Sequence, residues 1–110
     1  MVDLDTATRI VSEHLAAMER RMNDFGSTLP GHADRPQLHL VVTSTTEYDF
    51  GWLFTFAARE YLETGDLRCA LAGNAPLIVD RQEGQVYVTG TAHPVDHYLD
   101  EYRNGVRRRA

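Results

Sequence analysis

The sequence contains a single cysteine and no long apolar run, and each of these features excludes a class of protein. Cys69 alone cannot form an internal disulfide or a zinc site made of four cysteines, which fits a reducing compartment. No window approaches the roughly 18 to 20 apolar residues of a membrane-spanning helix. The N-terminus carries acidic rather than basic residues and no apolar run before a cleavage site, unlike a secretory signal. We therefore expect a cytoplasmic protein without a membrane segment.

The short motifs of common enzymes are also absent. Neither of the phosphate-binding glycine loops, GxxxxGK[ST] and GxGxxG, occurs in the sequence, and there is no GxSxG nucleophile turn. Nucleotide hydrolysis, dinucleotide redox chemistry and serine hydrolase chemistry therefore have no anchor in the sequence. We predict no catalytic residue and no cofactor, and we expect a binding protein.

The charge balance argues against nucleic acid as a partner. The net charge is -5 and the pI is about 5.4, whereas phosphate binding requires a clustered positive field. An acidic surface suits a basic partner instead. The one basic cluster is Arg107–Arg109, and we interpret residues 105–110 as a flexible, solubilising tail rather than an RNA or membrane contact.

A chain of 110 residues fits one domain, which we assign to residues 1–110. After Asp5 or Thr6, apolar residues recur at intervals of three and four, which predicts an amphipathic helix that ends near Asn23. His14 lies on the apolar side of this helix, and we interpret it as a packed, hydrogen-bonded core residue. Residues 25–36 contain two glycines and two prolines and predict a long loop extension.

A first pair of strands is predicted after this loop. Residues 38–44 and 50–58 are rich in β-branched and aromatic side chains, and TTEYD at 45–49 predicts a polar turn between them. In the second strand, Trp52 and every second residue after it share one face. We expect that face to be the core, because three contiguous exposed aromatic rings would form a patch that a soluble monomer seldom tolerates.

The remaining chain predicts a second hairpin and a second helix. Residues 59–76 show no clear period, and we expect one short helical turn around Leu67–Leu71 there. The runs LIVD and QVYVT flank RQEG, which is typical of a hairpin, and Asp80 is expected to bind the turn backbone near Gln82. Pro94 is expected at the first position of a helix that ends near Asn104.

Together these elements predict an α+β fold, with an antiparallel sheet of about four strands and both helices packed on one face. Edge strands of a small sheet can pair across a two-fold axis, so the chain is expected to be a monomer or a homodimer. The residues expected in the core are Trp52, Phe54, Phe56, Leu77, Val79, Tyr98 and Leu99.

Two features would suit a metal binder or an enzyme, which stays open as a third class of function. His93 and His97 are four residues apart, as two metal ligands on one helix face would be. No acidic third ligand is present in a HExxH arrangement, so we prefer a solvated, capping role and predict no metal ligand. Cys69 is interpreted as a small buried hydrophobe rather than a reactive thiolate.

Two acidic and aromatic connections, TTEYD and REYLETGD, are the best candidates for a binding surface. Tyrosine and charged side chains on connections are typical of recognition surfaces, although solvated turn residues are an equally good interpretation. The candidate partner-binding residues are Glu47, Tyr48, Asp49, Glu60, Tyr61, Glu63 and Asp66.

The run from Gly51 to Tyr102 contains GW with alternating aromatics, ARE with ETGD, LAGNAP, IVD with a hairpin Gly84, and GTAHP before a helix. In these motifs it resembles the YrhB-like family, which is also one of the immunity-protein families of bacterial polymorphic toxin systems. The resemblance implies a small cytoplasmic α+β protein without catalysis that binds and neutralises a cognate toxin. The alternative that it implies is a stress-related chaperone that works without ATP.

We prefer the toxin inhibitor over the chaperone. An inhibitor requires one complementary patch, whereas a chaperone of unfolded chains requires exposed apolar area that adapts to many clients. With the aromatic side chains assigned to the core, the sequence offers polar connections instead. The expected partner is therefore a protein toxin with a basic face, held by the acidic and tyrosine side chains of the two connections.

Overall fold

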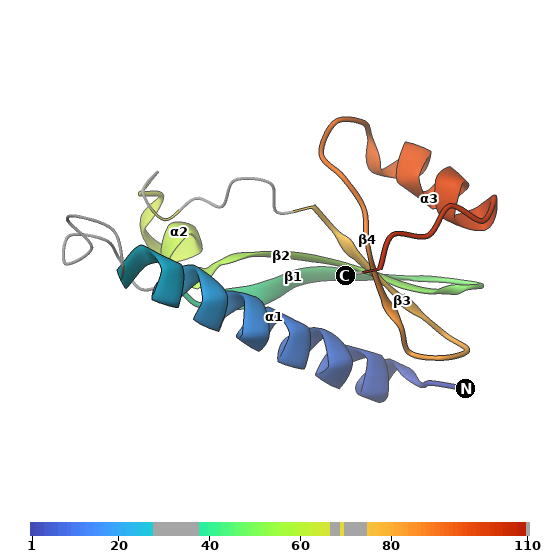
Figure 1. Ribbon diagram of the computed structural model, residues 1–110, viewed down its shortest axis with the longest axis horizontal. Coiled ribbons are helices and arrows are strands. Elements are labelled where there is room, and N and C mark those ends of the chain that lie inside the picture. Colours follow the sequence, from blue (N-terminus) through green and yellow to red (C-terminus); the bar gives the residue numbers. More distant parts are fainter. Residues whose placement is uncertain (28–37, 67–68, 70–74, 110) are drawn as a thin grey trace.

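The computed structural model describes residues 1–27, 38–66, 69 and 75–109. Its strands form one antiparallel sheet in the order β1-β2-β3-β4 (Figure 1). The predicted α+β class and the four-stranded antiparallel sheet are confirmed. No helix in these ranges is both long and apolar enough to cross a bilayer. The elements are α1 (Leu4–Ser27), β1 (Leu40–Tyr48), β2 (Gly51–Ala58), α2 (Arg59–Thr64), β3 (Leu77–Asp80), β4 (Val86–Val88) and α3 (Val95–Arg103).

Helix α1 is longer at both ends than the sequence predicts. It begins at Leu4 because Asp3 acts as its cap: the Thr6 backbone N–H donates to Asp3 Oδ1 at 2.8 Å. It continues past Asn23, whose side chain instead exchanges two hydrogen bonds of 3.2 Å with the backbone of Leu38, just before β1. Residues 25–27 of the expected loop are thus helical, and the rest of that loop lies outside the described residues.

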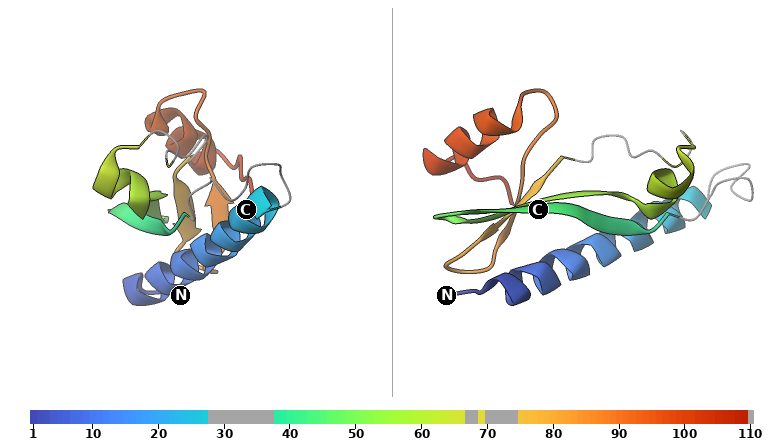
Figure 2. Two further views of the ribbon diagram at one scale, coloured as in Figure 1. Left: turned by 90° about the vertical axis from the view of Figure 1, so that its left-hand side faces the viewer. Right: turned by 180° about the vertical axis from the view of Figure 1, so that it is seen from behind.

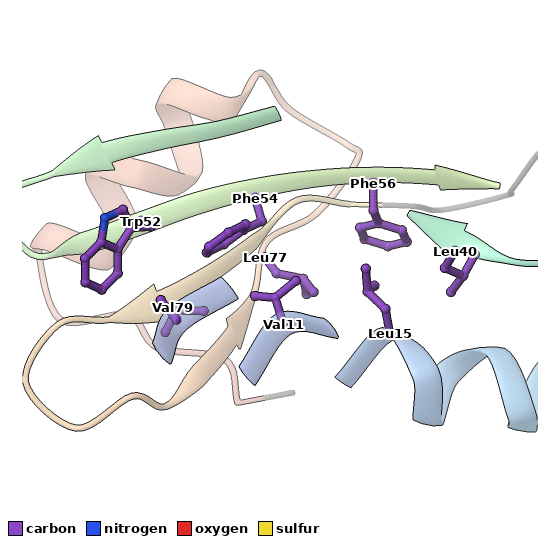
Figure 3. Close-up of a cluster of buried hydrophobic side chains, with 9 residues drawn as sticks. Val11, Leu15, Leu40, Trp52, Phe54, Phe56, Leu77 and Val79 are labelled. Carbon is purple, nitrogen blue, oxygen red and sulfur yellow. The ribbon is translucent and has the colours of Figure 1, made fainter. Parts of the chain in front are cut away.

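The first core lies between α1 and one face of the sheet (Figure 3). Val11 and Leu15 of α1 meet the alternating aromatic side chains of β2, of which Phe54 is fully buried. Beside this core, His14 is half-buried and lines a pocket, so the expected hydrogen-bonded core position is wrong. The core comprises Ala7, Val11, Leu15, Leu40, Trp52, Phe54, Phe56, Leu77 and Val79.

Helix α3 packs on the opposite face of the sheet, so the prediction that both helices share one face is wrong (Figures 1 and 2). The reason is that β2 and β3 are apolar on both sides: Leu53 and Ile78 alternate with the residues of the first core and are themselves buried. Leu99 and Tyr102 cover them, and Tyr87 completes this second core. Helix α3 begins at Val95, and Pro94 is its N-cap rather than its first residue.

The two hairpins are tighter than the sequence suggests. Strand β1 continues through Tyr48, which pairs with Gly51, so most of the expected TTEYD turn belongs to the strand. A side chain at Gly51 would collide with a β3 carbonyl, and its φ of +152° also favours glycine. In the second hairpin, Asp80 accepts a 3.0 Å hydrogen bond from the Glu83 backbone N–H, close to the expected position. The helical turn expected around Leu67–Leu71 lies outside the described residues, except for Cys69, which is buried.

The C-terminal residues do not form the free tail that the sequence suggests. Arg107–Arg109, here called the C-terminal arm, lie along the outer edge of β4. The Arg108 carbonyl accepts a 2.6 Å hydrogen bond from the Val88 N–H, and Arg109 forms a bridge with Tyr87. The Arg107 guanidinium lies 3.8 Å from the centre of the Tyr102 ring. The arm is therefore held by the backbone groups at the outer edge of β4 and by the Tyr102 ring on α3.

Candidate functional site

The seven candidate binding residues fall into two groups at opposite ends of β2. Glu47, Tyr48 and Asp49 lie at the β1–β2 hairpin and form the hairpin patch. The others lie on α2 or just after it, at the far end of the strand (Figure 1). The eight residues of β2 hold the two groups about 25 Å apart, at roughly 3.3 Å per residue. The sequence prediction of two separate connections therefore corresponds to two separate surfaces.

In the hairpin patch, the acidic side chain of Glu47 already has a partner within the chain. The Arg81 guanidinium donates to Glu47 Oε2 and to the Tyr48 carbonyl oxygen, both at 2.8 Å, and lies 4.6 Å from the centre of the Trp52 ring. Asp49 Oδ1 accepts a 3.1 Å hydrogen bond from the Phe50 N–H. These contacts fix the hairpin, although the Glu47 side chain remains 66% exposed.

An aromatic and arginine stack borders the hairpin patch, and sequence reasoning missed it. The rings of Tyr48 and Phe50 are parallel within 2°, with centres 5.3 Å apart. The Arg103 guanidinium from α3 lies 5.2 Å from the centre of the Phe50 ring. The period-two pattern placed Phe50 at a strand end, but no local signal indicates that Arg103 reaches it across more than 50 residues of sequence. The stack therefore joins α3 to the hairpin.

Helix α2 is held firmly at its first turn by the residue that precedes β1. His39 donates its backbone N–H to Glu60 Oε1 at 2.6 Å, and its ring Nδ1 lies 2.8 Å from Glu60 Oε2. The Arg59 N–H donates to the His39 carbonyl oxygen at 2.8 Å. Desolvation alone would raise the pKa of Glu60, but the hydrogen bonds from His39 hold that pKa below its ordinary value. Glu60 is thus an ionised anchor for α2.

The rest of α2 is open to solvent. None of its residues is buried, and Tyr61 and Leu62 are 36% and 56% exposed. Glu63 lies beside them, 3.7 Å from the Arg59 Nε, with a side chain that is 64% exposed. Leu62 was not among the sequence candidates, and the sequence predicted no helix over residues 59–64; a single leucine within the polar stretch REYLETGD was the usable signal. We call this surface the α2 patch: Tyr61 and Leu62 are bordered by acidic side chains, and its residues are Glu60, Tyr61, Leu62, Glu63 and Asp66.

Comparison with known proteins identifies the family. The sequence model for immunity protein 35 matches residues 5–105. The chain belongs to the immunity protein 35 family. The "Uncharacterized protein YrhB" of Escherichia coli (strain K12) is 45% identical over 71 residues, which cover 64% of this chain and 76% of that protein. No solved structure matches the chain. The predicted YrhB-like immunity family is confirmed.

The immunity protein 35 match is longer than the resemblance seen in the sequence. That resemblance began at Gly51, whereas the family match begins at residue 5 and includes α1 and β1. Both patches fall inside it, and Arg107–Arg109 fall outside. The helix that covers the first core therefore belongs to the region that the family model matches.

The histidine pair lies beside the C-terminal arm and is linked to it through Glu101. The rings of His93 and His97 are 4.2 Å apart, and His97 Nε2 lies 2.7 Å from Glu101 Oε1. Glu101 also forms a 2.7 Å ion pair with Arg108 of the arm. Among the residues described, no group of three or more His, Cys, Asp or Glu side chains is arranged to hold a metal ion.

Proposed function

We propose that this protein is a non-catalytic immunity protein that acts in the cytoplasm, where it binds a cognate bacterial toxin and neutralises it by occlusion. The observation that carries this proposal is the immunity protein 35 match, which spans residues 5–105. The fold supports the proposal, because it presents two polar and aromatic patches at opposite ends of β2. The protein would act as a monomer or a homodimer.

The α2 patch would supply the centre of the toxin interface. Exposed tyrosine and leucine side chains on a helix can fill pockets of a partner, and such anchors contribute most of the binding free energy of many interfaces. Because His39 fixes the first turn of α2, little ordering free energy would be spent when Tyr61 and Leu62 dock. Glu63 and Asp66 would border these anchors and favour a basic toxin face.

The hairpin patch would contact the same toxin at the other end of β1. A standard interface covers about 800 Å² on each partner, which corresponds to a patch about 30 Å across. The exposed run from Thr43 to Thr46 lies between the two patches and is wholly polar. A toxin lying along β1 would therefore reach α2, this run and the hairpin together. Opposite charges on the two proteins would also speed their encounter.

The proposal is tested by capturing the partner and then truncating the anchors. Tagged protein in lysate of its own host should retain one dominant partner after a moderate-salt wash, identified by mass spectrometry. Tyr61→Ala with Leu62→Ala should then weaken that partner's binding at least tenfold. The control is Leu4→Ala with Val106→Ala, which truncates exposed apolar side chains outside both patches. Equal binding by both double variants would place the interface elsewhere.

Charge is tested separately through association rates. Glu63→Gln with Asp66→Asn should slow association several-fold at low salt and reduce its salt dependence. Asp96→Asn with Asp100→Asn makes the same charge change on α3 and should leave the rate within a factor of two. If the two double variants slow association equally, the rate depends only on net charge, and the proposal that Glu63 and Asp66 contact the toxin is wrong.

The chaperone alternative has less support from the described surface. Its exposed large hydrophobic residues are divided among the N-terminus, α2 and the C-terminus, whereas a chaperone of unfolded chains requires contiguous adaptable area. Retention of many unrelated proteins in the capture experiment, increasing after heat shock, would favour the chaperone. The residues concerned are Met1, Leu4, Tyr61, Leu62 and Val106.

A further inference from the structure

A pocket of about 290 Å³ opens between α1 and the sheet face that α1 covers. Its floor is apolar and consists of Phe56, Leu77 and Val88, which come from three neighbouring strands. It lies where β3 and β4 stop, at Leu77 and Val88, whereas β2 continues to Ala58 and α1 to Ser27. It lies on the opposite face of the sheet from α3, and its lining residues belong to neither patch of the proposed toxin interface.

The wall of the pocket carries two polar groups that have no partner among the described residues. His14, Met18 and Arg21 line it from α1, at a spacing that places them on one side of the helix. Neither the His14 ring nor the Arg21 guanidinium has a hydrogen bond or an ion pair with any residue that the structure describes. The hydroxyl of Thr89, by contrast, donates to the Pro76 carbonyl oxygen at 2.7 Å and is satisfied.

The charge of the pocket comes from Arg21. Desolvation, followed by repulsion from Arg21, lowers the pKa of His14, so its ring is neutral at neutral pH. A neutral imidazole can donate one hydrogen bond and accept another. The guanidinium presents several N–H groups in a planar fork that matches a carboxylate. The pocket thus combines an apolar floor with one cation and one neutral hydrogen-bonding ring.

We propose that this pocket binds a small amphipathic carboxylic acid, with the carboxylate against Arg21 and His14 and the hydrocarbon on the apolar floor. A bare inorganic anion would leave the apolar floor without a partner, and a neutral hydrocarbon would leave the guanidinium without one. The volume is at the lower end of the range for small-molecule sites and suits a chain of medium length. This inference rests on the pocket alone and does not depend on toxin binding.

Octanoate is the probe, and binding is followed by NMR of the Met18 and Val88 methyl groups in the full chain. We expect saturable shifts at both methyl groups, with hexanoate about tenfold weaker because each buried methylene contributes a factor of about three to four. Octan-1-ol, which lacks the charge, should bind at least tenfold more weakly than octanoate. Arg21→Gln should weaken octanoate about tenfold. Arg20→Gln, at the neighbouring exposed position outside the pocket, should have no effect.

Several outcomes would overturn the proposal. Equal binding of octanoate and octan-1-ol would mean that the carboxylate is not recognised. Shifts at the Tyr61 and Leu62 signals in place of the pocket methyls would mean that octanoate acts as a surface detergent. No shift up to the solubility limit, with unchanged thermal unfolding of each variant as a check on folding, would also refute it. If a captured toxin shifts the pocket methyl signals and octanoate does not, the pocket receives a protein side chain and the proposal of a small carboxylic acid ligand is wrong.

Discussion

Truncation of Leu99 tests whether α3 supplies a second core of its own. Leu99 is 3% exposed and packs with Leu53, Ile78 and Tyr102 on the face opposite α1. Leu→Ala in a packed core costs about 2 to 5 kcal/mol, and the rigid strand and tyrosine neighbours leave little scope for collapse around the cavity. We therefore expect Leu99→Ala to lower the free energy of unfolding by about 3 kcal/mol, and the Tm by about 12 °C for a domain of this size.

Two other leucines provide matched controls for this measurement. Leu15→Ala removes the same atoms from the first core, where Leu15 is also 3% exposed, and should cost a similar amount. Leu62→Ala makes the same change on the exposed α2 and should cost less than about 0.5 kcal/mol. Urea unfolding monitored by Trp52 fluorescence gives all three values. If Leu99→Ala resembled Leu62→Ala, α3 would not form a core with the sheet.

Three further predictions follow from particular contacts. Burial raises the pKa of the Tyr102 hydroxyl to about 12 from an ordinary 10, so the folded protein favours the neutral hydroxyl. The contribution of this group to the free energy of unfolding is complete below pH 10 and is lost as the pH rises toward 12. Thermal unfolding between pH 9 and 11.5 should therefore be less pH-dependent in Tyr102→Phe. Gly51→Ala should lower the free energy of unfolding, measured in urea, by more than about 2 kcal/mol, because the added Cβ would collide with a β3 carbonyl. Gly65→Ala adds a Cβ in open space and should cost about 1 kcal/mol, from its positive φ alone. Glu60→Ala should release the first turn of α2, so hydrogen exchange at the Gly65 N–H, which is bonded to the Tyr61 carbonyl, should accelerate while β2 amides stay protected.

The sheet was predictable because its signals are local, and the placement of α3 was not. Alternation in β2 and the Gly84 hairpin signal fixed the strands to within a few residues. The burial of Leu53 and Ile78 could also have been predicted, because each is an apolar residue between apolar neighbours. A sheet that is apolar on both faces needs a packed element on each face. The error came from weighing the aromatic face alone, because three large rings outweigh one leucine on any hydrophobicity scale.

Partnerships over long sequence distances could not be predicted for the candidate site. Arg81 meets Glu47 from 34 residues away, and only the register of three strands brings them together. The separation of the two patches, by contrast, was available from the sequence, because Asp49 and Glu60 flank a strand of eight residues. Net charge and composition indicated acidic recognition, but they could not distinguish a free carboxylate from one that already anchors a helix, as Glu60 does.

The covered parts of the sheet favour β1 as the side on which a toxin would dock. Helix α1 covers one face, α3 covers part of the other, and the C-terminal arm pairs with the outer edge of β4. Within the described residues, the outer edge of β1 is unpaired and lies beside both patches. A bulge between Val42 and Ser44 interrupts the regular strand and discourages pairing between two copies of the chain. The exposed hydroxyl groups of Thr45 and Thr46 remain available for hydrogen bonds with a different protein, so this edge can resist self-association and still contact a toxin as proposed.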